Sequence, residues 1–152
     1  MDNVENIVSL EEYSVTYKPG IYFLGDPCYV IQGTELWDKA CEDSGEFRAF
    51  NEFAIAPTMY GDGAYYDKYS GKEFGVDSAS LGIVNLKYYH ENENVAYPLE
   101  ELGAVIEVND YVKFTYDPDE YSFSFEIDGA AVFIPTNDED DEDEVDNSDN
   151  EE

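Results

Sequence analysis

The sequence has few positive charges. Seven Lys and Arg residues stand against 37 Asp and Glu, which gives a formal net charge of −30. No basic patch with interleaved aromatic residues is present, so the sequence argues against direct nucleic-acid binding of the ordinary kind. A field of this sign repels nucleic acid and anionic membranes, and it speeds association with basic surfaces. The expected partner is therefore a basic surface of another protein.

Histidine and cysteine are also scarce. The chain has one histidine, His90, and two cysteines, Cys28 and Cys41. These residues have no zinc-ligand spacing, and a single disulfide does not make a disulfide framework. We expect two reduced thiols in a cytoplasmic protein, and the pattern indicates no cofactor.

Long apolar runs are absent as well. No run of about eighteen apolar residues occurs, so we expect no membrane-spanning helix. The first residues, "MDNVENIVSLEEY", contain no positive charge and no apolar signal core, which is typical of mature sequence.

What the sequence does contain indicates one β-rich domain. Its 152 residues are 43% hydrophobic and 16% aromatic, and aromatic side chains favour strands. We expect a single globular domain over residues 1–136. The remaining residues, 137–152, form an acidic low-complexity tail that has too few apolar residues to order itself.

The last part of the domain carries the clearest strand pattern. In "YSFSFEI" the residues alternate between apolar and polar, and Asp128-Gly129 follows as a hairpin turn before "AAVFI". "AVIEV" and "YVKFTY" flank Asn109-Asp110, and residues 117–120 join "YVKFTY" to "YSFSFEI". The pattern predicts a four-stranded antiparallel meander.

The first half is less regular. "EYSVTY", "IYFLG", "FRAFNEFAIA", "EFGVDS" and "LGIVNL" read as strands, and "TELWDKACED" reads as the one helix, with Thr34 as its cap and Ser44-Gly45 as its end. The fold class is mainly β (α+β), with eight or nine strands and one short helix. The architecture is an antiparallel sandwich or a partly open barrel.

The segment "GDPCYV" raises the question of a cysteine nucleophile. Cys28 and Asp26 are the candidate catalytic residues, but no base or cation lies near them in sequence and the acidic field disfavours a thiolate. Gly25, Asp26 and Pro27 are residue types that favour a tight turn. We interpret Cys28 as a buried structural residue that begins a strand.

Four aspartates are candidate ligands for a hard cation such as Ca²⁺. Asp62, Asp67 and Asp77 lie in a segment rich in glycine and tyrosine, and they would have to meet Asp26 in space. Their spacing matches no calcium loop. The alternative, which we favour, is that they form turns.

The acidic tail is the candidate partner-binding segment. Residues 138–152 hold 11 acids and no base. The run that we assign to partner binding consists of Asp138, Glu139, Asp140, Asp141, Glu142, Asp143 and Glu144. The alternative is that such a run only increases solubility.

The segments "GIYFLGDPCYVI", "YGDGAYYD" and "FGVDSASLGIV", together with Trp37, resemble segments of short phage and bacterial proteins of unassigned function. The resemblance covers about Gly20 to Val84. It implies an origin in a phage or mobile element, and hence the host cytoplasm, but it implies no activity.

Three functions remain open. The first is a non-enzymatic acidic protein that binds a basic surface of a host protein, in the extreme form as a DNA mimic or inhibitor. The second is a small enzyme that uses the "GDPCYV" and "YGDG" turns. The third is a structural or accessory protein of the virion.

Overall fold

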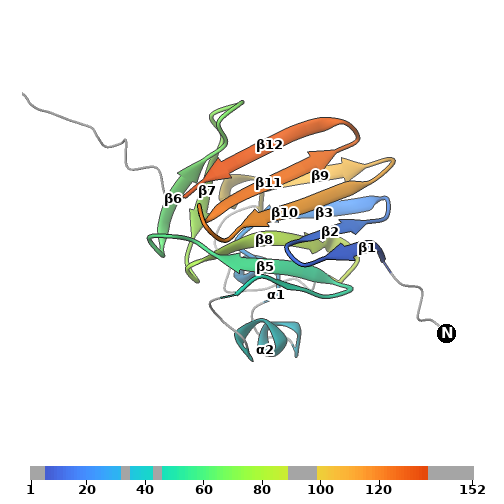
Figure 1. The fold of residues 1–152 in the computed structure, drawn as a ribbon, viewed down its shortest axis with the longest axis horizontal. Coiled ribbons are helices and arrows are strands. Elements are labelled where there is room, and N and C mark those ends of the chain that lie inside the picture. The colour runs from blue at the N-terminus through green and yellow to red at the C-terminus, as the bar shows by residue number, and fades with distance from the viewer. Residues whose placement is uncertain (1–5, 32–34, 43–45, 89–98, 137–152) are drawn as a thin grey trace, which may run out of the picture.

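The protein is a sandwich of two open antiparallel sheets, which confirms the predicted fold class (Figure 1). The computed structural model describes residues 6–31, 35–42, 46–88 and 99–136, and these residues form twelve strands. The first sheet has the order β1 (Ile7–Glu11), β2 (Ser14–Tyr17), β10 (Val112–Asp117), β11 (Ser122–Ile127) and β12 (Ala130–Pro135).

The central part of the second sheet is buried on both faces. The order of this sheet is β4 (Arg48–Ala49), β5 (Phe53–Pro57), β8 (Ser80–Asn85), β3 (Gly20–Gly25) and β9 (Ala104–Val108). Neighbouring residues of β3 show why: Leu24 packs between the sheets, whereas Phe23 packs under the helices. A strand that is covered on both faces needs apolar residues on both, so its sequence does not alternate between apolar and polar residues. The segment "FAIA" in β5 is apolar throughout for this reason.

The end of the chain confirms the predicted hairpin. Asp128 and Gly129 have φ angles of 52° and 95°, so both adopt the left-handed conformation of a type I′ turn between β11 and β12. In both strands the inward residues, such as Phe125 and Val132, face the core opposite one another.

The predicted four-stranded meander is wrong in one strand. β10, β11 and β12 form it, but β9 pairs with β3 in the second sheet. Residues 109–111 therefore cross from one sheet to the other. The Asp128 carboxylate holds this crossing because it accepts hydrogen bonds from the backbone N–H groups of Asn109, Asp110 and Tyr111.

A further correction concerns Cys28, which begins a helix and not a strand. α1 (Cys28–Ile31) starts directly after Asp26-Pro27, where Asp26 caps the helix and Pro27 occupies the first turn. The β-branched residues Val30 and Ile31 favour a strand locally, but burial under the second sheet outweighs that preference.

The predicted helix is confirmed as α2 (Glu35–Glu42). Ala40 is buried and Leu36 and Trp37 pack against the same apolar cluster, whereas Cys41 is exposed. In Figure 1, α2 lies beside β5 on the side away from β12. The predicted cap Thr34 and the end at 44–45 lie outside the described residues.

The remaining elements are short. They are β6 (Gly63–Tyr66) and β7 (Glu73–Val76), which form a two-stranded sheet, the 3₁₀ turn η1 (Leu86–Tyr88), and α3 (Leu99–Leu102). None of the helices in the described part of the chain is long and apolar enough to cross a membrane.

Candidate functional site

Asp26 is the most buried charged residue of the "GDPCYV" segment, with an exposed fraction of 0%. Its carboxylate accepts four hydrogen bonds. Oδ1 accepts from the Cys28 N–H at 2.9 Å and from the Ser78 hydroxyl at 2.7 Å. Oδ2 accepts from the N–H groups of Asp77 and Ser78, both at 2.7 Å. A carboxylate with this many donors is stable inside a protein, and its acceptor sites are already in use.

The Cys28 thiol is beside this carboxylate and is protected from reaction. Its side chain is only 5% exposed. Burial, and then the negative charges of Asp26 and Asp77, raise the pKa of the thiol far above its ordinary value of 9.0. Because the thiolate is the nucleophile, Cys28 and Asp26 together form a structural pair and not an activated cysteine. His90, the only histidine of the chain, lies outside the described residues.

The structure brings together only part of the proposed metal site. Asp77 contacts Asp26 through its backbone N–H, and the Asp62 carboxylate accepts the N–H of Ala79 at 2.9 Å, so these two segments are close. Within the described ranges, no group of three or more His, Cys, Asp or Glu side chains is arranged to hold a metal ion. The Asp62 carboxylate thus bonds a segment seventeen residues away and does not form a local turn.

Asp67 lies apart from the other three. Its carboxylate accepts hydrogen bonds from Ser70, from the Tyr69 N–H and from the Phe133 N–H on β12. Burial acts to raise the pKa of Asp67, but the hydrogen bonds from Ser70, Phe133 and Tyr69 outweigh it, and the pKa falls below the ordinary 3.8. Asp67 thus anchors the β6–β7 turn to the edge of the first sheet.

The segments quoted for the phage resemblance therefore meet in space, since Asp26 of "GDPC" is bonded to Asp77 and Ser78 of "VDS". Searches of protein-family models, curated proteins and solved structures found no match. The tail residues 138–144, predicted to bind a partner, lie outside the described residues.

An open pocket of about 320 Å³, which we call the aromatic pocket, lies at the end of the first sheet. Its lining consists of Glu12, Tyr13, Glu46, Phe47, Tyr116, Pro118 and Tyr121. The β1–β2 turn, the chain before β4, and the end of β10 with its following turn supply these residues.

The rings of this pocket hold one another in place. The centroids of Tyr13 and Phe47 are 6.2 Å apart, and those of Phe47 and Tyr116 are 6.4 Å apart. Tyr121 meets Tyr116 edge to face at 84°. The Tyr116 hydroxyl donates to the Pro57 carbonyl at 2.9 Å, which fixes the central ring.

The pocket is electrically negative. Glu12 and Glu46 are exposed at its edge. Burial, and then the neighbouring Tyr121, Asp117 and Tyr13, raise the pKa of Tyr116 above its ordinary value of 10.0. Aromatic faces and carboxylates both attract cations, so the pocket has the chemistry to hold a Lys or Arg side chain.

Sequence reasoning missed this pocket. Its residues come from three segments that are far apart along the chain. Neither "EEY" nor "GEF" contains a residue pattern that is typical of a binding site. The only signal was general, namely the high content of aromatic and acidic residues.

Proposed function

We propose that this protein is a non-enzymatic acidic protein that binds a basic surface of a partner protein, and that the aromatic pocket receives a Lys or Arg side chain of that partner. The observation that carries the proposal is the coexistence of fixed rings and two exposed carboxylates, Glu12 and Glu46, in one open pocket. A buried cation over aromatic faces contributes about 0.5–2 kcal/mol, and a paired carboxylate adds to this.

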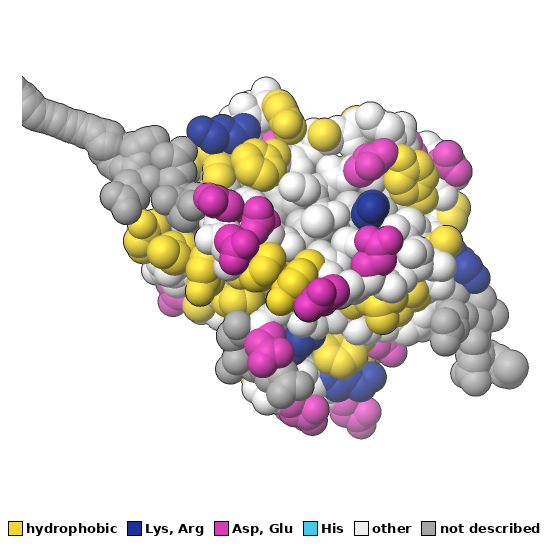
Figure 2. Space-filling model, viewed as in Figure 1, with side chains coloured by type: hydrophobic (Ala, Val, Ile, Leu, Met, Phe, Trp, Pro, Cys, Tyr) yellow, Lys and Arg dark blue, Asp and Glu magenta, His cyan; other side chains and the backbone are white. Residues whose placement is uncertain are grey.

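The distribution of charge supports the proposal. Figure 2 shows Asp and Glu side chains spread over the visible face, with several separate Lys or Arg side chains among them. Such a surface attracts a basic partner at long range and speeds the encounter, while a shaped pocket selects the residue that docks. The tail, including Asp138 to Glu144, adds to the attraction.

The phage resemblance extends the proposal to origin and setting. A phage-encoded protein of this kind would act in the host cytoplasm on a host protein. If that protein binds DNA, the carboxylates would stand where phosphates stand, and the chain would act as a DNA mimic or inhibitor.

The alternative of a small enzyme receives no support from the "GDPCYV" and "YGDG" turns. Cys28 is buried with a raised thiol pKa, and the acceptor sites of Asp26 are occupied by backbone and hydroxyl donors. No observation favours the virion alternative, which detection of the protein in purified particles would support.

Affinity capture from host lysate at two salt concentrations tests the proposal. The full chain and a chain that ends at residue 137 are compared at about 50 mM and about 300 mM NaCl, because exposed charge pairs weaken as the Debye length shortens. We expect capture of a basic protein by both chains at low salt, with loss at high salt and weaker capture by the shorter chain. Capture that does not depend on salt would contradict the proposal, and competition by duplex DNA would identify the DNA-mimic form.

A further inference from the structure

The four rings of the aromatic pocket face in different directions. The planes of Phe47 and Tyr116 are nearly parallel, at 12° to each other. Tyr13 stands at 66° to Phe47, and Tyr121 stands at 84° to Tyr116. A planar guanidinium stacks on a ring face, whereas a quaternary ammonium is round and can meet ring faces from several sides. The arrangement of the rings therefore suits a round cation.

The core holds the central rings in place. The Phe47 ring packs against Phe114 with centroids 5.6 Å apart, and the Tyr116 ring packs against Phe123 at 5.1 Å. Phe114 and Phe123 are fully buried. A site that is fixed in advance loses less conformational entropy when a ligand binds.

Tyr121 has a backbone conformation that is unfavourable for its side chain. Its φ angle is 54°, in the left-handed region where glycine or asparagine is the usual residue. The hydroxyl of Thr136, which is only 1% exposed, donates to the Tyr121 carbonyl and holds the turn. Backbone strain of this kind is concentrated at functional sites, where one particular side chain is needed. We therefore interpret the Tyr121 ring as a functional wall of the pocket.

No Lys or Arg residue of the chain itself lines the pocket. All seven of them lie in the described part of the chain, and the two lysines that lie over aromatic rings lie over Phe50 and Phe74, outside the pocket. The carboxylates of Glu12 and Glu46 form no hydrogen bond or ion pair with any of the described residues. Rings and carboxylates are therefore both available to an incoming cation.

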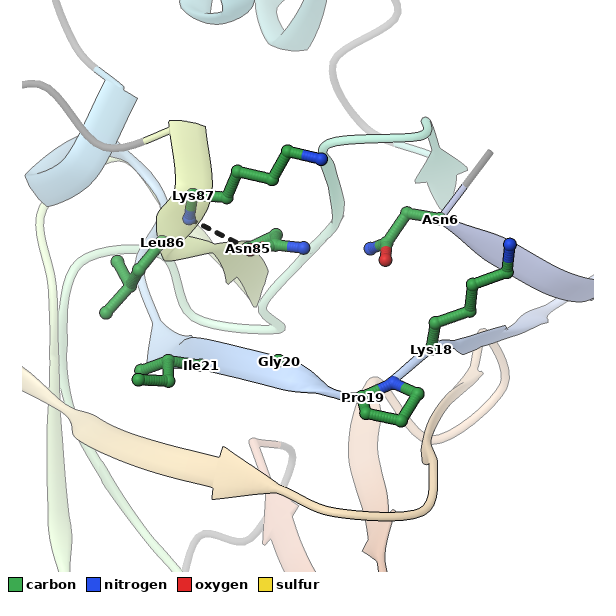
Figure 3. Close-up of a pocket in the computed structure, with 8 residues that line it drawn as sticks. All are labelled: Asn6, Lys18, Pro19, Gly20, Ile21, Asn85, Leu86 and Lys87. Atoms are coloured by element: carbon green, nitrogen blue, oxygen red, sulfur yellow. Dashed lines mark hydrogen bonds between the residues drawn. The ribbon is translucent and has the colours of Figure 1, made fainter. Parts of the chain in front are cut away.

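A larger pocket, of about 650 Å³, lies where β3 starts and has a different chemistry. Figure 3 shows Lys18 and Lys87 among its lining residues, and none of the described lining residues is acidic. A cation would find no carboxylate there with which to pair. Of the two pockets, the aromatic pocket is the one whose lining suits a cation.

Methyl groups on the cation suit the aromatic pocket better than N–H groups do. A primary ammonium has three donors and is strongly hydrated, so it needs several acceptors when water is removed. Methylation of a lysine keeps the positive charge and replaces these donors with apolar groups. The methyl groups can be buried against the ring faces and Pro118, while Glu12 and Glu46 balance the charge.

The surrounding charge favours a methylated lysine over a choline-type head. Phosphocholine carries a phosphate close to its quaternary ammonium, and the carboxylates of Glu12, Glu46 and Asp117 would repel that phosphate. The stem of a lysine side chain carries no charge besides its ammonium group. A lysine side chain therefore brings the cation without the anion.

We propose that the aromatic pocket binds an N-trimethylated lysine side chain of a partner protein, with the quaternary ammonium among the four rings and beside Glu12 and Glu46. This inference rests on the proposed function, in which the pocket receives a basic side chain, and it specifies the chemical form of that side chain. Recognition of the partner then depends on its methylation.

Titration calorimetry with four peptides tests this proposal. Each is a short glycine-serine peptide with one central residue: trimethyllysine, lysine, arginine, or the neutral analogue of trimethyllysine in which carbon replaces the nitrogen. We expect the trimethyllysine peptide to bind at least about tenfold more tightly than the other three.

The outcomes separate this inference from the proposed function. A smaller preference over lysine or arginine would overturn the inference and leave the proposed function standing. Equal binding of the neutral analogue would overturn it as well, because the charge would then contribute nothing. Tighter binding of phosphocholine, as a fifth probe, would contradict the assignment to a protein side chain. No binding of any cationic peptide up to about 5 mM would contradict both the inference and the proposed function.

Matched tyrosine variants locate the site. Tyr13→Ala removes an exposed ring of the pocket, and Tyr66→Ala removes an exposed ring of β6 that does not line the pocket. We expect the first variant to weaken trimethyllysine binding at least about tenfold and the second by less than about twofold. Equal affinities would contradict the assignment. Both side chains are exposed, so both variants should fold, and a thermal melt verifies this.

Tyr121→Gly provides a second variant of the pocket. Glycine relieves the left-handed backbone at this position while it removes the ring. We expect trimethyllysine binding to weaken at least about tenfold in a protein that still shows a cooperative thermal melt. Unchanged affinity of this folded variant would contradict the role that we give to the Tyr121 ring.

Discussion

At the scale of single residues, Asp26 shows how a charged side chain becomes part of the core. Its four hydrogen bonds join the start of α1 to the turn before β8, two parts of the chain about fifty residues apart. The Asx-type turn of "GDP" was predictable from its residue types, but the donors from Asp77 and Ser78 were not. Contacts between residues this far apart along the chain produce no local sequence pattern from which they could be predicted.

Asp26→Asn tests this role of Asp26. The NH₂ group of the new asparagine is a donor and would face other donors. If it replaces Oδ2, it faces the backbone N–H groups of Asp77 and Ser78, which then lose their acceptor. We expect the free energy of unfolding to fall by about 3 kcal/mol in urea denaturation, since buried donors lose their acceptor. Asp77→Asn is the control, because only the backbone of Asp77 bonds Asp26, and it should change stability by less than about 0.5 kcal/mol. Equal effects of the two variants would contradict the role that we assign.

The two cysteines provide a test of reactivity within one chain. Cys41 is exposed and Cys28 is buried beside two carboxylates that raise its thiol pKa. We expect Cys41 to react with a thiol reagent in the native protein at pH 7 and Cys28 to react only after denaturant is added, because the thiolate is the reacting form. Single Cys→Ser variants assign the two rates. Rapid labelling of native Cys28 would reopen the possibility of an enzyme.

At the scale of elements, the sequence pattern predicted strands well where one face is buried. The alternation of β11 and the Asp128-Gly129 turn are local signals, and both were correct. The prediction failed for β9, because a short polar connection between two strands has the same residue types whether the chain turns back or crosses to another sheet. It failed for α1 as well, where an Asp-Pro start is stronger than the β-branched residues that follow.

The attachment of the β6–β7 turn to β12 should depend on pH through Asp67. The pKa of Asp67 is lowered in the folded state, so its contribution is present above the unfolded value near 3.8 and is lost as pH falls. We expect Asp67→Asn to reduce the free energy of unfolding by about 2 kcal/mol at pH 7 and the difference to shrink below about pH 4. Urea denaturation across this range measures it. For comparison, Glu73→Gln on the exposed side of β7 should show no such convergence.

At the scale of the whole molecule, charge and shape act over different distances. The net charge of −30 acts beyond contact range and is shared by the domain and its tail. In the function that we propose, the aromatic pocket acts only at contact, where Glu12 and Glu46 would meet a basic side chain of the partner. Composition alone predicted the first effect. The second required the fold, because three separate segments build the pocket.

Binding of a labelled oligo-arginine peptide to two charge-matched variants tests the central claim most directly. Glu12→Gln with Glu46→Gln removes two acids from the aromatic pocket, and Glu100→Gln with Glu101→Gln removes two from α3. Both variants have the same net charge, so the long-range field changes equally. Fluorescence anisotropy at about 100 mM salt should show affinity at least about tenfold weaker for the first pair and within about twofold of the unmodified protein for the second. Equal affinities of the two variants would contradict the claim that the aromatic pocket receives the basic side chain.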